Sequence, residues 1–170
     1  MKRQGRQGAK VAKVLLDGTA AGWRASKGSA TSEEQAPYGQ PRRREPTQRA
    51  DALARSVIGA AIAVHRELGP GFPEVVYQRA LAIELEALGI PFEREQPFTV
   101  CYRGASVGKG QLDFLVGDIL VVELKAVEAV LPLHRAQVTA YLKALKLELG
   151  LLINFNTQVL KHGIERVVRT

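Results

Sequence analysis

Two acidic residues and one lysine lie within apolar segments of the sequence. Asp113 is embedded in residues 111–116 (QLDFLV), and residues 121–125 (VVELK) contain Glu123 and Lys125. Acidic side chains are depleted in strands and costly in cores, so carboxylates in two neighbouring apolar strands indicate a functional site. Glu123 and Lys125 are two residues apart and therefore project from the same face of a strand.

This set of side chains suits phosphodiester hydrolysis. Two carboxylates on adjacent strands, Asp113 and Glu123, form a hard-oxygen site that fits Mg²⁺ or Mn²⁺. Such an ion lowers the pKa of a bound water and polarises a phosphoryl oxygen. Lys125 would orient the attacking water or stabilise charge in the transition state. The structural alternative is a surface ion pair between Glu123 and Lys125, because the E-x-K pattern is common.

The hairpin between the two strands decides whether the acids can share a site. Gly117-Asp118 is a typical hairpin turn. If these two residues were the whole loop, Asp113 would pair with Val122, and Glu123 would face away from it. A shared site needs Asp113 opposite Glu123, which requires a loop of about three or five residues, or a β-bulge. We therefore predict an odd-length loop or a bulge.

Glu74 is a third candidate acid, in the segment 71–77 (GFPEVVY) at the expected start of a helix. Its functional interpretation is an acid that the helix brings to the metal edge of the sheet. Its structural interpretation is a charge that complements the helix dipole in the first turn. Tyr77, about one turn later, is either a core residue or a site hydroxyl.

Gln137 and Tyr141 are four residues apart on a third expected helix, so they share one face. Their functional interpretation is contact with a phosphate or with Lys125. The structural alternative is an ordinary pair on the helix surface.

The net charge of +7 is unevenly distributed along the 170 residues. Residues 1–46 contain ten Lys/Arg and four Asp/Glu, a net charge of +6, whereas residues 47–170 contain 14 and 13, a net charge of +1. The first segment is predicted to be a disordered basic tail and the second a folded domain. The sole cysteine, Cys101, excludes an internal disulfide, and no apolar segment resembles a membrane span or a secretory signal. We expect a cytoplasmic protein.

Hydrophobic periodicity predicts an α/β order of elements in residues 47–170. Helical spacing follows Asp51, a candidate N-cap, and stops at Gly69; Pro73 suits the first position of a second helix. From Pro91 onwards the period changes to two, and it later returns to helical spacing. The predicted helices are 51–68, 73–88 and 132–146, and the predicted strands are 98–102, 107–116, 119–125, 149–154 and 164–168.

Together these features resemble the GxxExxY protein family, a branch of the PD-(D/E)XK nuclease superfamily. The naming motif is Gly71, Glu74 and Tyr77, and the superfamily motif resembles Asp113 followed by Glu123-Leu124-Lys125. Further similarity comes from the Q-x-x-x-Y element of several exonuclease branches, here Gln137 and Tyr141, and from residues 149–155 (LGLLINF). The resemblance covers residues 51–170, and the motifs are specific as an ordered set. Pro73 and Asn156 depart from the family pattern.

The resemblance implies a restriction-endonuclease-like αβββαβ core, with a central mixed sheet flanked by helices. It implies that Asp113 and Glu123 bind Mg²⁺ or Mn²⁺ together with the backbone carbonyl of Leu124. Lys125 would serve catalysis, and Glu74 would be the helix acid beside the metal. The implied activity is metal-dependent hydrolysis of nucleic acid, with DNA expected ahead of RNA and no membrane partner.

Two other functions fit the same fold. One is a catalytically inactive module that binds nucleic acid, although intact Asp113, Glu123 and Lys125 argue against it. The other is a protein-interaction partner in a genome-defence or toxin–antitoxin system.

Overall fold

The structure is a computed structural model that describes residues 45–169. All but the last two residues of the predicted basic tail therefore lie outside the described part. The elements are α1 (Gln48–Leu68), α2 (Glu74–Ala87), β1 (Phe92–Tyr102), β2 (Ala105–Val116), β3 (Leu120–Lys125), α3 (Pro132–Leu145), β4 (Leu149–Asn154), the short 3₁₀ helix η1 (Leu160–Gly163) and β5 (Ile164–Val168). No helix among residues 45–169 is long and apolar enough to span a membrane.

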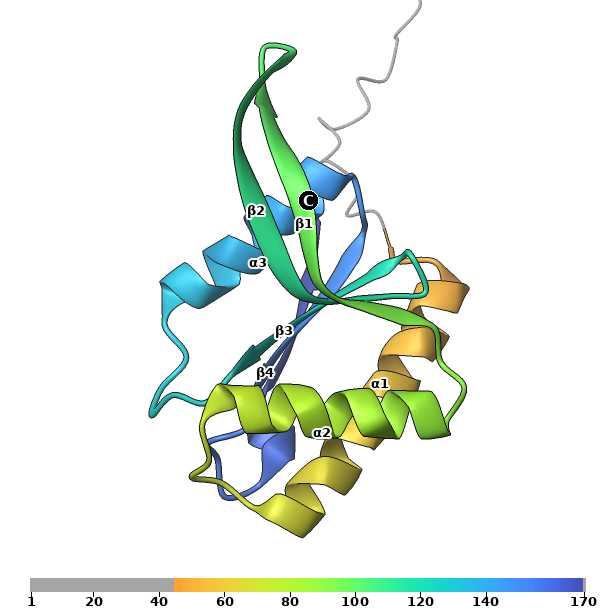
Figure 1. Ribbon diagram of the computed structural model, residues 1–170, viewed down its shortest axis with the longest axis vertical. Helices are drawn as coiled ribbons and strands as arrows, with labels where there is room; N and C mark the ends of the chain where they lie inside the picture. Colours follow the sequence, from red (N-terminus) through yellow and green to blue (C-terminus); the bar gives the residue numbers. More distant parts are fainter. Residues whose placement is uncertain (1–44, 170) are drawn as a thin grey trace, which may run out of the picture. The chain divides into compact units, whose positions relative to one another are not determined.

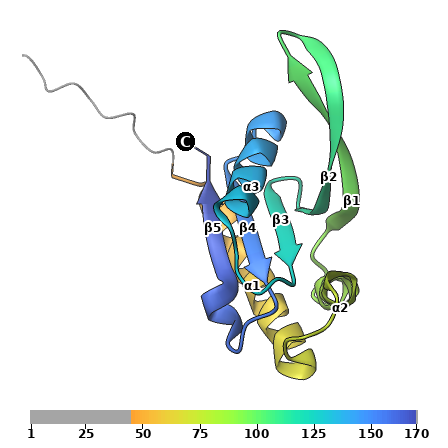
Figure 2. The same ribbon diagram turned by 90° about the vertical axis from the view of Figure 1, so that its left-hand side faces the viewer.

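The five strands form one mixed sheet in the order β1-β2-β3-β4-β5. Strands β3 and β4 are parallel, and every other neighbouring pair is antiparallel. Helices α1 and α2 cover one face of the sheet and α3 covers the other (Figures 1 and 2). This arrangement confirms the predicted restriction-endonuclease-like α/β core.

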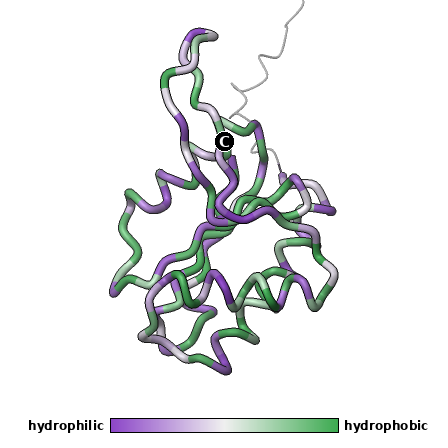
Figure 3. Tube along the Cα trace, viewed as in Figure 1, coloured by the Kyte–Doolittle hydropathy of each residue, from purple (hydrophilic) through white to green (hydrophobic). Residues whose placement is uncertain are grey.

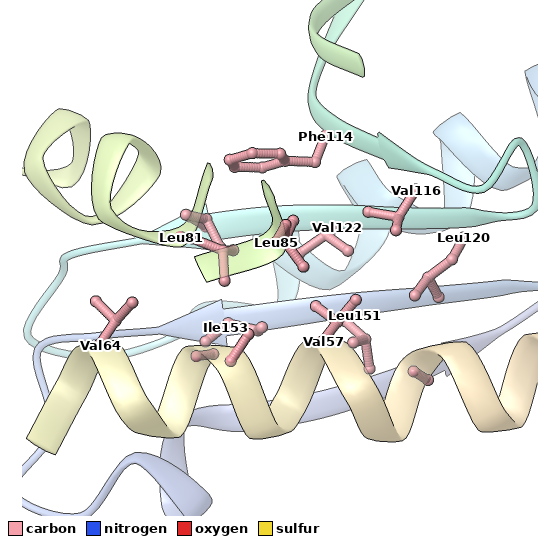
Figure 4. Packing of buried hydrophobic residues seen from close by; sticks show 14 of the residues in the cluster. Val57, Val64, Leu81, Leu85, Phe114, Val116, Leu120, Val122, Leu151 and Ile153 are labelled. Atoms are coloured by element: carbon pink, nitrogen blue, oxygen red, sulfur yellow. The ribbon is translucent and has the colours of Figure 1, made fainter. Parts of the chain in front are cut away.

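The main core lies between the sheet and helices α1 and α2 (Figure 4). Strand β4 is buried along its whole length, as expected for a central strand covered on both faces. Alternate residues of β3 divide between the two faces: Val122 and Leu124 join the α1–α2 core, whereas Val121 packs with α3. Glu123 and Lys125 therefore project from the α3 face.

Helix α1 begins earlier than predicted, because its N-cap is Thr47 and not Asp51. The Thr47 hydroxyl accepts a hydrogen bond from the backbone N–H of Ala50 at 3.2 Å and so satisfies a free N–H group of the first turn. Asp51 lies within that turn and pairs with Arg166 of β5. Gly69 ends the helix as predicted, with φ 66°.

Helix α2 also begins one position away from the prediction. Pro73 is its N-cap, with an extended backbone (φ −59°, ψ 148°), so Glu74 is the first helical residue. The loop before it needs a glycine, because Gly71 has φ 108°. Tyr77 holds this loop in place: its hydroxyl donates to the Gly69 carbonyl at 2.7 Å and accepts from the Phe72 N–H at 3.1 Å.

The β2–β3 hairpin has the odd-length loop that a shared site requires. Val116 pairs with Leu120, so the loop is the three residues 117–119. Gly117 and Asp118 both have positive φ, and the Ile119 N–H donates to the Val116 carbonyl at 3.2 Å. This loop confirms the predicted hairpin geometry.

Strand β1 begins at Phe92, whereas the prediction began at residue 98. Residues 93–97 (EREQP) are polar or proline and mostly exposed, so this edge strand lacks the alternation that marks a half-buried strand. The far ends of β1 and β2 extend away from the other strands as a two-stranded arm (Figure 1). Hydrophilic and hydrophobic residues are mixed along this arm, whereas the central strands are mostly hydrophobic (Figure 3).

Candidate active site

Asp113 lies where strand β2 separates from β3. Paired residues extend from the turn only to Phe114 and Val122. Beyond that pair, the Asp113 side chain takes the place of a backbone partner, because its Oδ2 accepts a hydrogen bond from the Leu124 N–H at 2.7 Å. Continuing the register by one residue places Asp113 across from Glu123, as the predicted shared site requires.

Glu123 and Lys125 form a largely buried ion pair. The Lys125 Nζ donates to Glu123 Oε1 at 2.7 Å, and the two side chains are 14% and 4% exposed, respectively. A pair this buried differs from the solvent-exposed one that was the structural alternative. The second carboxylate oxygen, Glu123 Oε2, is buried and has no hydrogen-bond partner within residues 45–169. An unpaired buried carboxylate oxygen is costly unless a ligand satisfies it.

Glu74 reaches the same region from the first turn of α2. Its charge interacts with Lys125 and Asp113, and the Ala126 backbone N–H stabilises its carboxylate. Burial nevertheless raises the pKa of Glu74 above its ordinary value. The residues of the motif at 71–77 thus have different roles. Gly71 and Tyr77 shape the loop, and Glu74 faces Asp113. Tyr77 itself is fully buried and stacks on Phe155 at a centroid distance of 4.4 Å, so it is a core residue.

Burial raises the pKa of all three acids, and the charge of Asp113 further raises the pKa of Glu123 and of Glu74. Burial and the charge of Asp113 raise the pKa of Glu123 from 4.5 to about 7, against the opposing effect of Lys125. Burial also raises the pKa of Asp113, although its hydrogen bond to Leu124 counteracts this. Burial lowers the pKa of Lys125, but Glu123, Glu74 and Asp113 outweigh it, so the net pKa is raised. The lysine is therefore an ammonium group at neutral pH, able to donate hydrogen bonds but not to act as a base.

Gln137 and Tyr141 of α3 approach the site as a linked pair. The Gln137 Nε2 donates to the Tyr141 hydroxyl at 2.6 Å, so the tyrosine proton is directed elsewhere. Burial raises the pKa of Tyr141, and the charges of Glu123 and Lys125 also act on it. Tyr141 is thus electrostatically coupled to the acids, and Gln137 reaches the site through Tyr141.

Gln78 is a site neighbour that sequence reasoning missed. Its Nε2 donates to Asp113 Oδ1 at 3.0 Å, while Leu124 holds Oδ2. Both oxygens of Asp113 therefore have a fixed partner. Gln78 follows Glu74 by four residues on α2, and that spacing on one helical face was the available signal.

Asn154 is a second residue that was missed. It is 2% exposed at the end of β4, and its side-chain amide bonds both the N–H and the carbonyl of Val127, at 3.1 and 2.8 Å. These bonds fix the path of the chain just after Lys125. The available signal was a polar residue at the end of an otherwise apolar strand.

The donors present fit a hard divalent cation with a limited set of protein ligands. Within residues 45–169, no three His, Cys, Asp or Glu side chains are gathered closely enough to hold a metal. The carboxylates of Asp113 and Glu123 are therefore the two acidic ligands available to a metal, and Glu123 Oε2 is a free donor among them. The Leu124 N–H points towards Asp113, and in a strand the carbonyl of the same residue points to the same side. Leu124 therefore offers a carbonyl oxygen in the gap between β2 and β3.

Comparison with known proteins identifies a family. The family model described as the PD-(D/E)XK nuclease superfamily matches residues 51–167, a range that includes every candidate site residue above. No curated protein and no solved structure matches the chain. The family match covers more than half of the chain and agrees with the sheet and helices described here. The chain therefore belongs to the PD-(D/E)XK nuclease superfamily.

Proposed function

We propose that this protein is a metal-dependent nuclease that hydrolyses phosphodiester bonds of nucleic acid, with DNA as the expected substrate. The observation that carries the proposal is the unpartnered, buried Glu123 Oε2 beside Asp113 and the Lys125 ammonium. A buried carboxylate oxygen in a purely structural ion pair normally has a hydrogen-bond partner. A divalent cation would satisfy Glu123 Oε2.

Asp113, Glu123 and the Leu124 carbonyl would hold Mg²⁺ or Mn²⁺, with Glu74 acting from the helix side through a bound water. The bound ion would supply an activated water and polarise the phosphoryl oxygens. The chain would supply orientation and charge. Gln78 holds Asp113 in one rotamer, and Lys125 provides a fixed positive charge for the developing negative charge on the phosphate.

Tyr141 would act as a hydrogen-bond donor to a phosphate oxygen. Its raised pKa keeps the phenol protonated, and the hydrogen bond that it accepts from Gln137 leaves its own proton available. Gln137 is then a positioning residue for Tyr141. The single free cysteine, Cys101, supports a reducing compartment such as the cytoplasm.

The test is cleavage by the purified full chain of labelled single- and double-stranded DNA and RNA, with Mg²⁺ or with EDTA. We expect cleavage only with the metal, and a loss of about 100-fold or more in Lys125→Ala. Lys143→Ala is the matched control, because Lys143 is an exposed lysine in the last turn of the same α3 that carries Tyr141. Cleavage that survives Lys125→Ala unchanged would overturn the proposal.

A further inference from the structure

The β1–β2 arm, residues 98–110, has a surface that no other part of the described chain covers. Strand β2 pairs with β3 only near the turn, and beyond it the two arm strands extend away from the sheet (Figures 1 and 2). Every residue from 99 to 109 is exposed. An uncovered two-stranded ribbon is marginal by itself, so its extension into solvent needs a reason other than packing.

The base of the arm is anchored to the helix that carries Tyr141. Phe98 is 8% exposed, and its ring lies edge-on to the Tyr141 ring at a centroid distance of 5.1 Å. Gly110 lies across the strand pair from Phe98, and a Cβ there would overlap the Phe98 ring. The absence of a side chain at Gly110 therefore leaves room for the Phe98 ring. The ring in turn packs the base of the arm against Tyr141.

Tyr102 lies near the tip of the arm and is 62% exposed. Its cross-strand partner is Ala105, which has a small side chain, and the Arg103 guanidinium lies over one face of the ring. Phe98 and Val100 alternate along β1 and so share one face of the arm. The register with β2 shifts by one residue between Val100 and Cys101, just before Tyr102. Tyr102 is about 13 Å along the strand from Phe98, at about 3.3 Å per residue.

The arm is cationic, although the folded domain as a whole is almost neutral. Residues 96–112 contain Arg103 and Lys109 and no Asp or Glu. The Arg103 guanidinium lies 5.4 Å from the centroid of the Tyr102 ring, so a positive charge lies next to an aromatic ring. A second copy of the arm would bring like charges together, which disfavours self-association.

We propose that the arm binds unpaired nucleotides of the substrate, with Tyr102 stacking on a base and Arg103 and Lys109 contacting phosphates. The proposal rests on the proposed function and narrows its substrate to nucleic acid with a single-stranded segment. Stacking on an aromatic side chain needs an exposed base face, which unpaired nucleotides offer and duplex does not. The Phe98–Tyr141 contact would then hold those nucleotides on the side of the arm that leads to the acids.

The test is binding by the full chain in EDTA, where cleavage does not interfere. The probes are a fluorescein-labelled oligothymidine of about twenty nucleotides and a blunt duplex of equal length, followed by fluorescence anisotropy. We expect tighter binding of the oligothymidine. Tyr102→Ser should weaken this binding at least about fivefold, and Tyr102→Phe, which keeps the ring, should restore it. Gln substitutions of Arg103 and Lys109 should each reduce the salt dependence by about 0.7 in log–log slope.

Lys161→Ala is the matched control, because Lys161 is an exposed lysine of η1, outside the arm. Every variant keeps residues 1–46, so any contribution of that basic segment cancels. Unchanged oligothymidine binding by Tyr102→Ser would overturn the proposal, as would an equal loss on the duplex. A change in sedimentation of Tyr102→Ser would overturn it in favour of a second copy as the partner.

The two proposals fail separately. If the arm proposal holds and the nuclease proposal fails, Tyr102→Ser should still weaken oligothymidine binding in EDTA, although the wild type cleaves no substrate with Mg²⁺. If Lys125→Ala abolishes cleavage but Tyr102→Ser leaves binding unchanged, the nuclease proposal stands and the arm proposal falls.

Discussion

The Asp113 carboxylate accepts a hydrogen bond from the Leu124 backbone N–H at 2.7 Å, at the point where two paired strands separate. One side chain thus closes the gap in the ladder and is held beside Glu123 on the neighbouring strand. The acid can be kept there because Gln78 bonds its other oxygen. The point at which β2 and β3 separate therefore also determines where Asp113 lies in the candidate site.

Removing the charge of Glu123 should change how stability depends on pH. Its pKa rises from 4.5 to about 7 on folding, so between these values the folded chain holds a proton that the unfolded chain has released. Metal-free stability should therefore fall as pH rises through this window, by up to about 3 kcal/mol. Glu123→Gln should flatten this slope. Urea unfolding in EDTA from pH 4 to 8 measures it; an equally steep slope in the variant would contradict the assignment.

Asp113→Ala should abolish metal binding without unfolding the domain. The wild type should gain thermal stability on titration with Mn²⁺, by about 2.7 kcal/mol at a hundredfold excess over Kd, and the variant should gain none. Glu86→Gln is the control, because it removes an exposed carboxylate from the same domain. If wild type and Asp113→Ala respond equally to Mn²⁺, the acids are not a metal site.

Gln78→Ala should weaken metal binding although Gln78 is not itself a ligand. Losing the hydrogen bond to Asp113 Oδ1 frees that carboxylate to rotate, and residues that orient ligands contribute about 10-fold to 100-fold in affinity. Isothermal titration with Mn²⁺ measures the effect. Arg79→Ala, the exposed next residue on α2, should bind as the wild type does. Equal affinities for the two variants would mean that Leu124 alone positions Asp113.

Tyr77→Phe should destabilise the fold by about 1–3 kcal/mol, because it removes both hydrogen bonds of a buried hydroxyl while keeping the stacked ring. The loop before Glu74 should loosen, so nuclease activity should fall further than the lost stability alone explains. Denaturation and cleavage assays on the same preparations separate the two effects. Tyr102→Phe, at an exposed position, should change stability by less than about 0.5 kcal/mol.

The sequence predicted most elements of the fold because their hydrophobic periods are strong. Strands β4 and β5 were predicted with the bounds observed, and parity required either an odd loop or a bulge between Asp113 and Glu123, of which the structure has the odd loop. The first half of β1 was not predicted, since an exposed edge strand has no apolar alternation. The N-cap of α1 was misplaced because both Thr47 and Asp51 could cap a helix and only the structure selects between them.

The site was less accessible to prediction than the fold. Asp113, Glu123 and Lys125 could be found because each conflicts with its apolar neighbours. Gln78 and Asn154 were missed, because they act on residues 35 and 27 positions away and the signals in their own segments are weak. Residues of this kind are identified by what they hold in place, which only tertiary contacts reveal.

Within the three-residue turn at 117–119, insertions and deletions should affect the chemistry more than substitutions do. One residue more or less would shift β3 by one position, and every side chain on it would change faces. Glu123 and Lys125 would then enter the α1–α2 core, and Leu124 would occupy the site. The number of residues in this turn thus determines whether the two acids face each other. Inserting or deleting one codon there would remove the site while leaving all of its residues in the chain.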